Sequence, residues 1–123
     1  MITVLPCKET EEIKAEFEKR NLTFTDNSFC VKAKCDEEIL GLCLFEIKDG
    51  FVTVLHIEPQ EDIMLADGIL RSALHVAAER FIFKANYLSD ELTELFNKLA
   101  FIKDKENKIL DMDKLFGGCG CKK

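Results

Sequence analysis

The chain has 123 residues, of which 47% are apolar and 33% are charged. This length and composition predict one globular domain with one hydrophobic core, and they exclude a disordered chain. The apolar runs fall well short of the ~20 residues that span a bilayer. The N-terminus shows no basic stretch followed by an apolar one, so we expect no secretory signal, no membrane partner and a cytoplasmic location.

The net charge is −6, and basic residues are interspersed with acidic ones along the chain. Proteins that bind nucleic acid typically gather Lys and Arg on one surface. We therefore expect no nucleic-acid partner. The acidic balance favours cationic or neutral small partners, or it reflects an ordinary solvated surface.

The first half of the chain predicts a strand, a helix and a three-stranded antiparallel meander. Thr10 is placed to cap the helix, with carboxylates in the first turn, and Asn21 ends it. Asp49-Gly50 is a strong tight-turn signal, and Pro59 stops strand pairing. The predicted ranges are 1–6 for the first strand, 8–20 for the helix, and 29–33, 39–47 and 51–57 for the meander, with a polar turn at 35–38.

The second half predicts a crossover helix, a further strand, another helix and a final strand pair. Apolar residues at helical spacing follow Gly68 and continue to Phe81. A helix between two strands of one sheet implies that the strands pair in parallel. Ser89 is the predicted N-cap of the last helix. The predicted ranges are 82–85 for the strand after the crossover, a helix after residue 89 with apolar residues Leu92, Leu95, Phe96 and Leu99, and 101–102 with 108–112 for the final pair.

Six cysteines are spread along the chain: Cys7, Cys30, Cys35, Cys43, Cys119 and Cys121. We expect reduced thiols, and Cys7, Cys30 and Cys43 lie in apolar runs that predict small core residues. The tail at 117–123 carries Cys119 and Cys121 one glycine apart. Three interpretations stay open for it: a flexible reduced tail, a chelate for a soft metal, or an easily reduced bridge. We predict no zinc site, because no second pair has suitable spacing.

Three stretches resemble the GNAT superfamily of N-acetyltransferases in sequence and in element order. They are the strand at 52–59, the helix start at 68–74, and Leu-Phe-Asn-Lys-Leu-Ala-Phe at 95–101, which is similar to the family's closing Leu-Tyr-x-Lys-Leu-Gly-Phe. The resemblance implies one GNAT-like α/β domain over residues 1–123, with a central mixed sheet and helices on both faces. It also implies acetyl-CoA or another acyl-CoA as cofactor, and a small-molecule or protein amine as acceptor.

In that family the carrier's pyrophosphate lies on amides at the start of the central helix, because free N–H groups and the positive helix end attract phosphate. The loop here departs from the family pattern: Leu65 replaces a basic or amide residue, Leu70 replaces a small one, and Asp67 adds a negative charge. The resemblance places the carrier-binding amides at Gly68, Ile69, Leu70 and Arg71 in the helix, and at Leu55 and Ile57 on an open strand edge.

Family enzymes often use a strand carboxylate as the general base and a Tyr of the last helix as the acid. Phe96 occupies the position of that Tyr and cannot donate a proton, so Tyr87 is the remaining candidate acid. His56 and Glu58 alternate onto one strand face and are the candidate general bases. A surface or hydrogen-bonded structural role for these two residues stays open.

The sequence therefore predicts a diverged acyl-CoA-dependent N-acetyltransferase acting on an unknown amine. The alternative is a non-catalytic binding module of the same fold that has lost acetyl-CoA binding, with a thiol or metal role for the tail. The chain is short for the family and lacks the second helix that usually walls the acceptor side. A second copy of the chain, in a homodimer, could complete the cleft.

Overall fold

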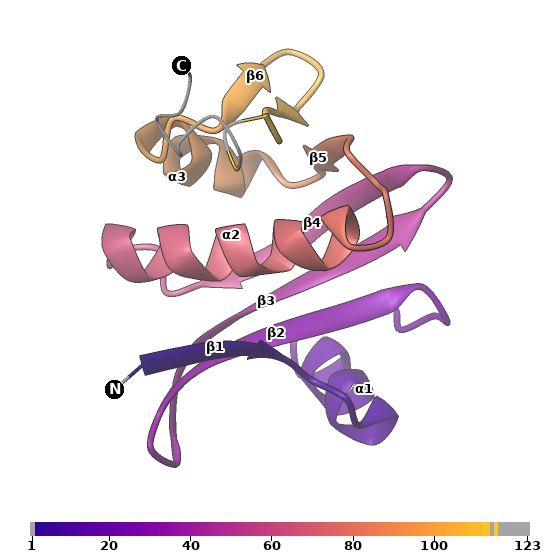
Figure 1. Ribbon diagram of the computed structural model, residues 1–123, viewed down its shortest axis with the longest axis vertical. Coiled ribbons are helices and arrows are strands. Elements are labelled where there is room, and N and C mark those ends of the chain that lie inside the picture. Colours follow the sequence, from indigo (N-terminus) through magenta and orange to yellow (C-terminus); the bar gives the residue numbers. More distant parts are fainter. Residues whose placement is uncertain (1, 114, 116–123) are drawn as a thin grey trace.

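The computed structural model describes residues 2–113 and Leu115, and its elements follow the predicted order (Figure 1). The chain begins with an edge strand and a helix, continues through a meander, and crosses over by a long helix to the second half of the sheet. The elements are β1 (Ile2–Pro6), α1 (Thr10–Lys19), β2 (Ser28–Cys35), β3 (Glu38–Lys48), β4 (Phe51–Glu58), α2 (Ile63–Ala78), β5 (Ala85–Tyr87), the 3-10 turn η1 (Asp90–Leu92), α3 (Thr93–Lys98), β6 (Ile102–Asp104) and β7 (Ile109–Leu110).

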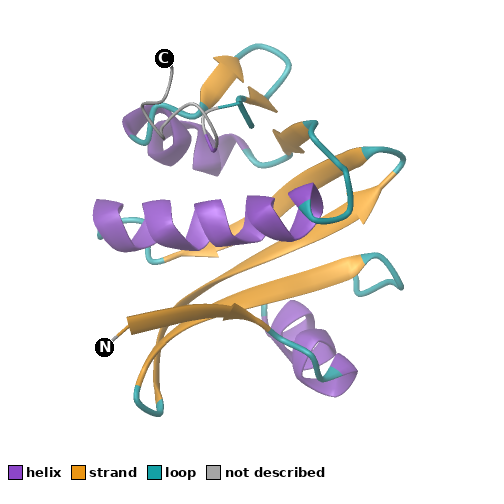
Figure 2. Ribbon diagram, viewed as in Figure 1, coloured by secondary structure: helices purple, strands orange, loops and turns teal. Residues whose placement is uncertain are grey.

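The described strands form one seven-stranded sheet in the order β1-β2-β3-β4-β5-β7-β6 (Figure 2). Neighbours from β1 to β4 pair antiparallel, and β4 pairs with β5 in parallel. The parallel pair confirms the crossover that the strand–helix–strand pattern predicts. The short strands β7 and β6 then extend the sheet beyond β5 by antiparallel pairing.

The two tight turns of the meander use left-handed backbone. Asp49 and Gly50 have φ angles of 56° and 83°, as a type I′ hairpin turn requires, so the predicted turn is confirmed. The β2–β3 turn is shorter than predicted. Pairing continues to Cys35 opposite Glu38, and Asp36, with φ 56°, reverses the chain.

Helices cover both faces of the sheet, as predicted, and strand residues alternate between two apolar clusters. The larger cluster lies under α2 and includes Tyr87 and Phe96. The smaller one lies under α1, where Phe17 is fully buried. Residues Val31, Ala33, Cys43, Phe45, Val54 and Ile57 belong to the α2 side, and Cys30, Leu42 and Leu44 to the α1 side.

Gly41 allows β3 to pass unusually close to the β4–α2 connection. A Cβ atom at Gly41 would lie 2.4 Å from the carbonyl oxygen of Glu58 and 2.7 Å from Cδ of Pro59. These distances are far inside van der Waals contact, so the close packing requires glycine. The carboxylate of Asp62 accepts from the N–H of Leu65 at 3.1 Å and thereby caps α2.

Three sequence predictions differ from the structure. Helix α2 ends at Ala78, and Phe81 takes φ 64° and is 84% exposed. The chain therefore turns before it rejoins the sheet, so the strand predicted at 82–85 is wrong and β5 begins only at Ala85. Thr10 is the first helical residue rather than the cap, and Glu9 precedes it without a side-chain cap bond.

Other boundary predictions are confirmed. Ser89 accepts from the N–H of Glu91 at 3.2 Å and caps η1. Asn21, at φ 59°, ends the first helix region. The chain passes from α1 to β2 through residues 20–27, where the structure shows no second helix. The Cys-Gly tail at 117–123 lies outside the described residues.

Candidate functional site

The middle of β4 carries a bulge where its pairing with β5 stops. On the β3 side, Phe45 pairs with Val54 and Leu44 pairs with His56, so Leu55 is the extra residue. On the β5 side, the last pair is Val54 with Tyr87. A bulge redirects the backbone and often marks a site. The β5-side edge of residues 55–58 is therefore open to a ligand's amide groups.

His56 and Glu58 lie on the same face of β4, as predicted, and their side chains interact. Nε2 of His56 lies 2.6 Å from Oε1 of Glu58. Arg20, just beyond α1, holds both oxygens of Glu58, with Nε and Nη2 each 3.2 Å away. Burial raises the pKa of Glu58, but the hydrogen bonds from Arg20 and His56 outweigh it and leave the pKa below its usual range. Glu58 is thus held as a carboxylate beside the imidazole.

The ion pairs continue from Arg20 into the interior beneath α1. Nη1 of Arg20 lies 2.9 Å from Oε1 of Glu16, and Nζ of Lys32 lies 2.8 Å from Oε2 of Glu16. Glu12 also contacts Nζ of Lys32. Lys32 and Glu16 are buried. We call the set Glu12, Glu16, Arg20, Lys32, His56 and Glu58 the ion-pair network.

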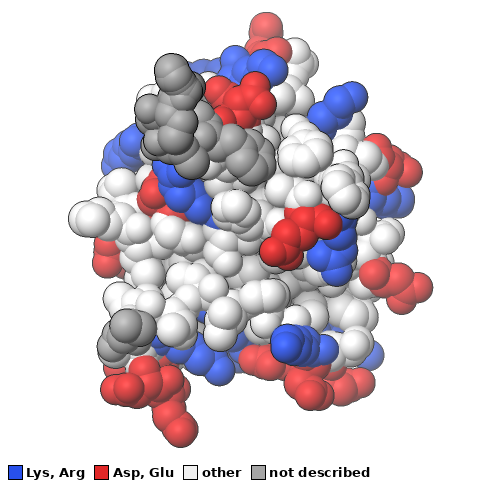
Figure 3. Space-filling model, in the orientation of Figure 1, with Lys and Arg blue, Asp and Glu red and all other residues white. Residues whose placement is uncertain are grey.

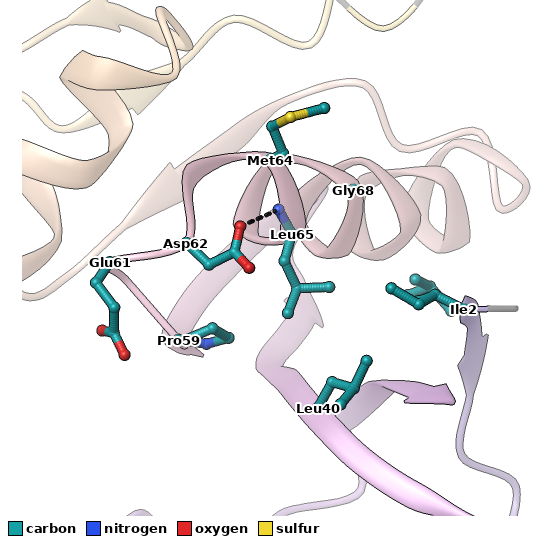
Figure 4. Close-up of a pocket in the computed structure, with 9 residues that line it drawn as sticks. Ile2, Leu40, Pro59, Glu61, Asp62, Met64, Leu65 and Gly68 are labelled. Carbon is teal, nitrogen blue, oxygen red and sulfur yellow. Dashed lines mark hydrogen bonds between the residues drawn. The ribbon is translucent and has the colours of Figure 1, made fainter. Parts of the chain in front are cut away.

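Two adjoining cavities flank the connection from β4 to α2. A groove of about 500 Å³ is lined by His56, Glu58 and Gln60, among others. A larger cavity of about 750 Å³ lies between the start of α2 and strands β1 and β3 (Figure 4). Its lining is mostly apolar, with Leu40 and Leu65 directed into it, and Leu40, Pro59 and Glu61 border both spaces. The His56–Glu58 pair and an apolar space thus lie side by side.

The start of α2 differs from the arrangement that the resemblance implies. Gly68 lies in the second turn of the helix, so the N–H groups of residues 68–71 point to carbonyls of the preceding turn. The first turn is where an α-helix leaves N–H groups without a helical acceptor. These groups belong here to Ile63 and Met64, because Asp62 already occupies the N–H of Leu65. The predicted amides at Gly68, Ile69, Leu70 and Arg71 are therefore not the free ones of this helix.

Side chains around this helix start partly offset one another's charge. Nε of Arg71 lies 2.8 Å from Oδ2 of Asp67, so the negative charge predicted beside a phosphate is paired. The Arg71 guanidinium also lies 5.2 Å from the centre of the Phe101 ring. A space of about 250 Å³ lies between Met64, Asp67 and Lys98, and Lys98 is 3.4 Å from Glu94. Among the described residues, no basic side chain forms an ion pair with Glu61 or Asp62, which line the larger cavity.

Tyr87 lies in the core rather than at the groove. It is 1% exposed, and its hydroxyl is 2.9 Å from Oγ1 of Thr93. Its ring packs edge-on against Phe96 at 5.0 Å. In this geometry the phenol cannot donate a proton to a group in the groove, so we do not assign Tyr87 as the acid.

Arg20, Glu16 and Lys32 were not predicted as part of the site, although the sequence carries two signals. Lys32 interrupts the otherwise apolar run at 29–33, and a lysine buried in a sheet requires acidic partners. Glu16 and Arg20 also show the i, i+4 spacing of a helical ion pair. Nothing in the sequence indicates that Arg20 would reach Glu58 on β4.

Charges of both signs are interspersed on the face shown in Figure 3, around a broad uncharged area. Among the described helices, none is long and apolar enough to cross a membrane.

Several solved acetyltransferase structures share this fold, whereas no protein-family model and no curated protein matches the sequence. The IAA acetyltransferase from Bacillus cereus ATCC 14579 has a TM-score of 0.62 at 15% identity, over 80% of this chain and 75% of that one. A Bacillus subtilis acetyltransferase in complex with CoA has a TM-score of 0.59 at 14% identity, over 83% and 77%. The ribosomal-protein-alanine N-acetyltransferase from Brucella melitensis biovar Abortus 2308 has a TM-score of 0.59 at 16% identity, over 85% and 94%.

These similarities define the class of fold. The chain has the GNAT fold of the N-acetyltransferases, a mixed sheet with helices on both faces, as the sequence predicts. At these identities the likeness concerns the fold, and the chemistry has to be argued from the residues of this chain.

Proposed function

We propose that this protein transfers an acyl group from acyl-CoA to an amine. The observation that carries the proposal is that the open, bulged edge of β4 and the His56–Glu58 pair belong to the same four residues. An open edge supplies hydrogen-bond partners for an extended amide-containing arm. The side chains of the same segment supply a group that can take a proton. Acetyl-CoA, when bound, would provide the thioester carbonyl that the amine attacks.

The residues of the chain fit such a carrier in part. The backbone of Leu55 and Ile57 lies on the open edge, and the N–H groups of Ile63 and Met64 are suited to phosphate. Lys98 lines the space beside Met64. Glu61 and Asp62 oppose anion binding at the same place. We therefore expect weak carrier binding whose affinity changes with salt, because charges of both signs lie there.

His56 is the proposed proton acceptor. Because Glu58 is held as a carboxylate, it accepts the Nε2–H of His56 and leaves Nδ1 as the basic nitrogen. An amine in the groove of about 500 Å³ would lose its proton to Nδ1 as its nitrogen attacks the thioester carbonyl. The C–S bond would then break, and CoA would leave as a thiolate that takes up a proton from solvent. Arg20 thus positions Glu58, and the Glu58 carboxylate orients and stabilises the imidazolium rather than acting as the base. The adjoining apolar cavity favours an acceptor that carries an apolar group.

The second candidate is a binding module of the same fold that performs no transfer. The observation that favours it is the capping of α2 by Asp62, which removes one amide and places a carboxylate where a phosphate would lie. In this case the apolar cavity and not the β4 edge would be the binding site.

Calorimetric titration with acetyl-CoA at low and moderate salt distinguishes the two candidates. Binding of acetyl-CoA supports the first, and the amine screen then compares wild type with His56→Gln. We expect about 10²-fold or more loss of kcat in His56→Gln. His75→Gln is the matched control, because His75 is exposed on α2. Absence of acetyl-CoA binding up to millimolar concentration would overturn the transferase proposal, and equal activity of the two variants would overturn the role of His56.

A further inference from the structure

Two cysteines that the proposed function does not use lie opposite each other on neighbouring strands. The register that pairs Pro6 with Val31 brings Cys7 opposite Cys30, and the N–H of Cys7 donates to the carbonyl of Cys30 at 2.8 Å. Such a hydrogen-bonded antiparallel pair separates the Cα atoms by about 5.5 Å. This lies within the range of about 4.4–6.8 Å that disulfides span.

The side chains of this pair share one face of the sheet, because residues directly opposite on antiparallel strands project to the same side. Both belong to the apolar cluster beneath α1. Both thiols are free. The backbone pairing therefore places the two side chains where a bridge between the strands can form.

The two thiols have different surroundings. Cys30 is 1% exposed, whereas Cys7 is half-buried and lines a small cavity of about 190 Å³ together with Lys8, Lys32 and Lys34. Interaction with the neighbouring Cys30 thiol lowers the pKa of the Cys7 thiol against the opposing effects of burial and nearby acids, and the charge of Lys32 adds to the lowering. Interaction with Cys7 and burial raise the pKa of Cys30. Cys7 is thus the accessible nucleophile and Cys30 the buried partner.

We propose that Cys7 and Cys30 are a redox pair that a hydroperoxide converts into a disulfide between β1 and β2. The Cys7 thiolate attacks one peroxide oxygen, the O–O bond breaks, and the leaving oxygen takes up a proton as water or alcohol. Cys7 is then a sulfenic acid. The Cys30 thiol attacks its sulfur, the S–O bond breaks, and a second water leaves. Two thiols are oxidised, the peroxide is reduced, and a dithiol reductant reverses the bridge.

The other described cysteines provide matched controls. Cys43 is fully buried in the cluster on the opposite face, and burial raises its pKa. Cys35 lies on the same strand as Cys30, and like Cys7 it is half-buried, but its partner across the strands is Ile2. Cys35 therefore matches Cys7 in exposure and lacks a thiol opposite it.

Peptide mapping after brief treatment of the folded full-length protein with hydrogen peroxide tests the proposal. Unreacted thiols are first alkylated without reductant. Trypsin then cuts after Lys8, Arg20 and Lys32, so Cys7 and Cys30 fall in separate peptides, 1–8 and 21–32, that hold no other cysteine. We expect these two peptides to form the dominant cross-link, to be lost in Cys7→Ser and Cys30→Ser, and to persist in Cys35→Ser.

Trapping of the intermediate gives the direction of the reaction. In Cys30→Ser, dimedone should label peptide 1–8, because the sulfenic acid of Cys7 has no thiol to close on. In Cys7→Ser, peptide 21–32 should stay unlabelled. A wild-type protein that oxidises at Cys35 or in the tail while peptides 1–8 and 21–32 remain reduced would overturn the proposal. This readout uses the wild-type chain, so a variant that fails to fold does not weaken the test.

Discussion

The ion-pair network beneath α1 allows a quantitative prediction for the contribution of Glu16 to stability. Burial acts to raise the pKa of Glu16, but hydrogen bonds from Lys32 and Arg20 lower it to about 2 from the ordinary value of 4.5. A pKa lowered to this extent corresponds to roughly 3 kcal/mol of stability at neutral pH. Because the carboxylate and Lys32 are both buried, solvent screens the interaction little. We expect Glu16→Gln to lower the free energy of unfolding by about 3 kcal/mol at pH 7.

The pH dependence has a definite sign. The pKa of Glu16 is depressed in the folded protein, so its contribution is complete above about pH 5 and declines as the pH falls from the ordinary value of 4.5 towards about 2. The difference between wild type and Glu16→Gln should therefore shrink on acidification. Urea unfolding at pH 7 and at pH 3 measures it. Glu18→Gln, an exposed carboxylate of the same helix, should change stability by less than about 0.5 kcal/mol.

A double-mutant cycle distinguishes the contribution of the Glu16–Lys32 ion pair to stability from the effect of replacing either residue alone. Lys32→Met alone leaves Glu16 with a missing buried partner, whereas Lys32→Met in the Glu16→Gln background removes both charges. The second substitution should cost less there than in the wild type, because the two sites are coupled. The reasoning is refuted if Glu16→Gln and Glu18→Gln are equally stable at pH 7, or if the two substitutions are additive.

Two further predictions concern packing and Tyr87. Gly41→Ala should destabilise the protein by about 1–3 kcal/mol or more, because the new Cβ would lie 2.4 Å from the carbonyl oxygen of Glu58. The Cβ of Gly68→Ala meets nothing within 4 Å, so this substitution should stabilise α2 by about 0.5–1 kcal/mol. Thermal unfolding of the two variants measures these opposite changes in stability. Tyr87→Phe should lose the hydrogen bond to Thr93 and lower the free energy of unfolding by about 1 kcal/mol. Any transferase activity should stay within about twofold of wild type. A much larger loss of kcat would show that the phenol acts as the acid.

The element order could be predicted from the sequence because it is encoded locally. Asp49-Gly50 specifies a turn, Pro59 ends a strand, and the apolar spacing after Gly68 distinguishes helix from strand. The strand boundaries could not be predicted equally well. Whether the chain rejoins the sheet at residue 82 or at Ala85 depends on the turn that Phe81 makes, and an apolar residue in a left-handed conformation has no local signal.

The candidate site also combines features that local sequence predicts with features that it does not. The shared face of His56 and Glu58 follows from the alternation of a strand, and the structure confirms that they touch. Glu58 accepts hydrogen bonds from Arg20, which is 38 residues away in the chain. No sequence periodicity relates the two residues. The free amides of α2 differ from the expectation for a related reason. The family resemblance places them from Gly68 onward, whereas Asp62 caps the helix earlier and makes Gly68 an interior residue.

The two halves of the proposed site respond differently to sequence change. The open edge depends on where β5 leaves β4, after Tyr87, and on the bulge at Leu55, so it is a property of the backbone. Backbone groups can persist through almost complete replacement of side chains, which is consistent with a shared fold at identities of 14–16%. Phosphate binding at the start of α2, the phosphate end of the site, depends on side-chain charge, and acidic side chains lie there. The salt dependence of acetyl-CoA binding therefore reports on this end, whereas the effect of His56→Gln reports on the proton acceptor. A protein that binds acetyl-CoA without any salt dependence would hold it by the strand edge alone, and the helix start would then have no part in binding.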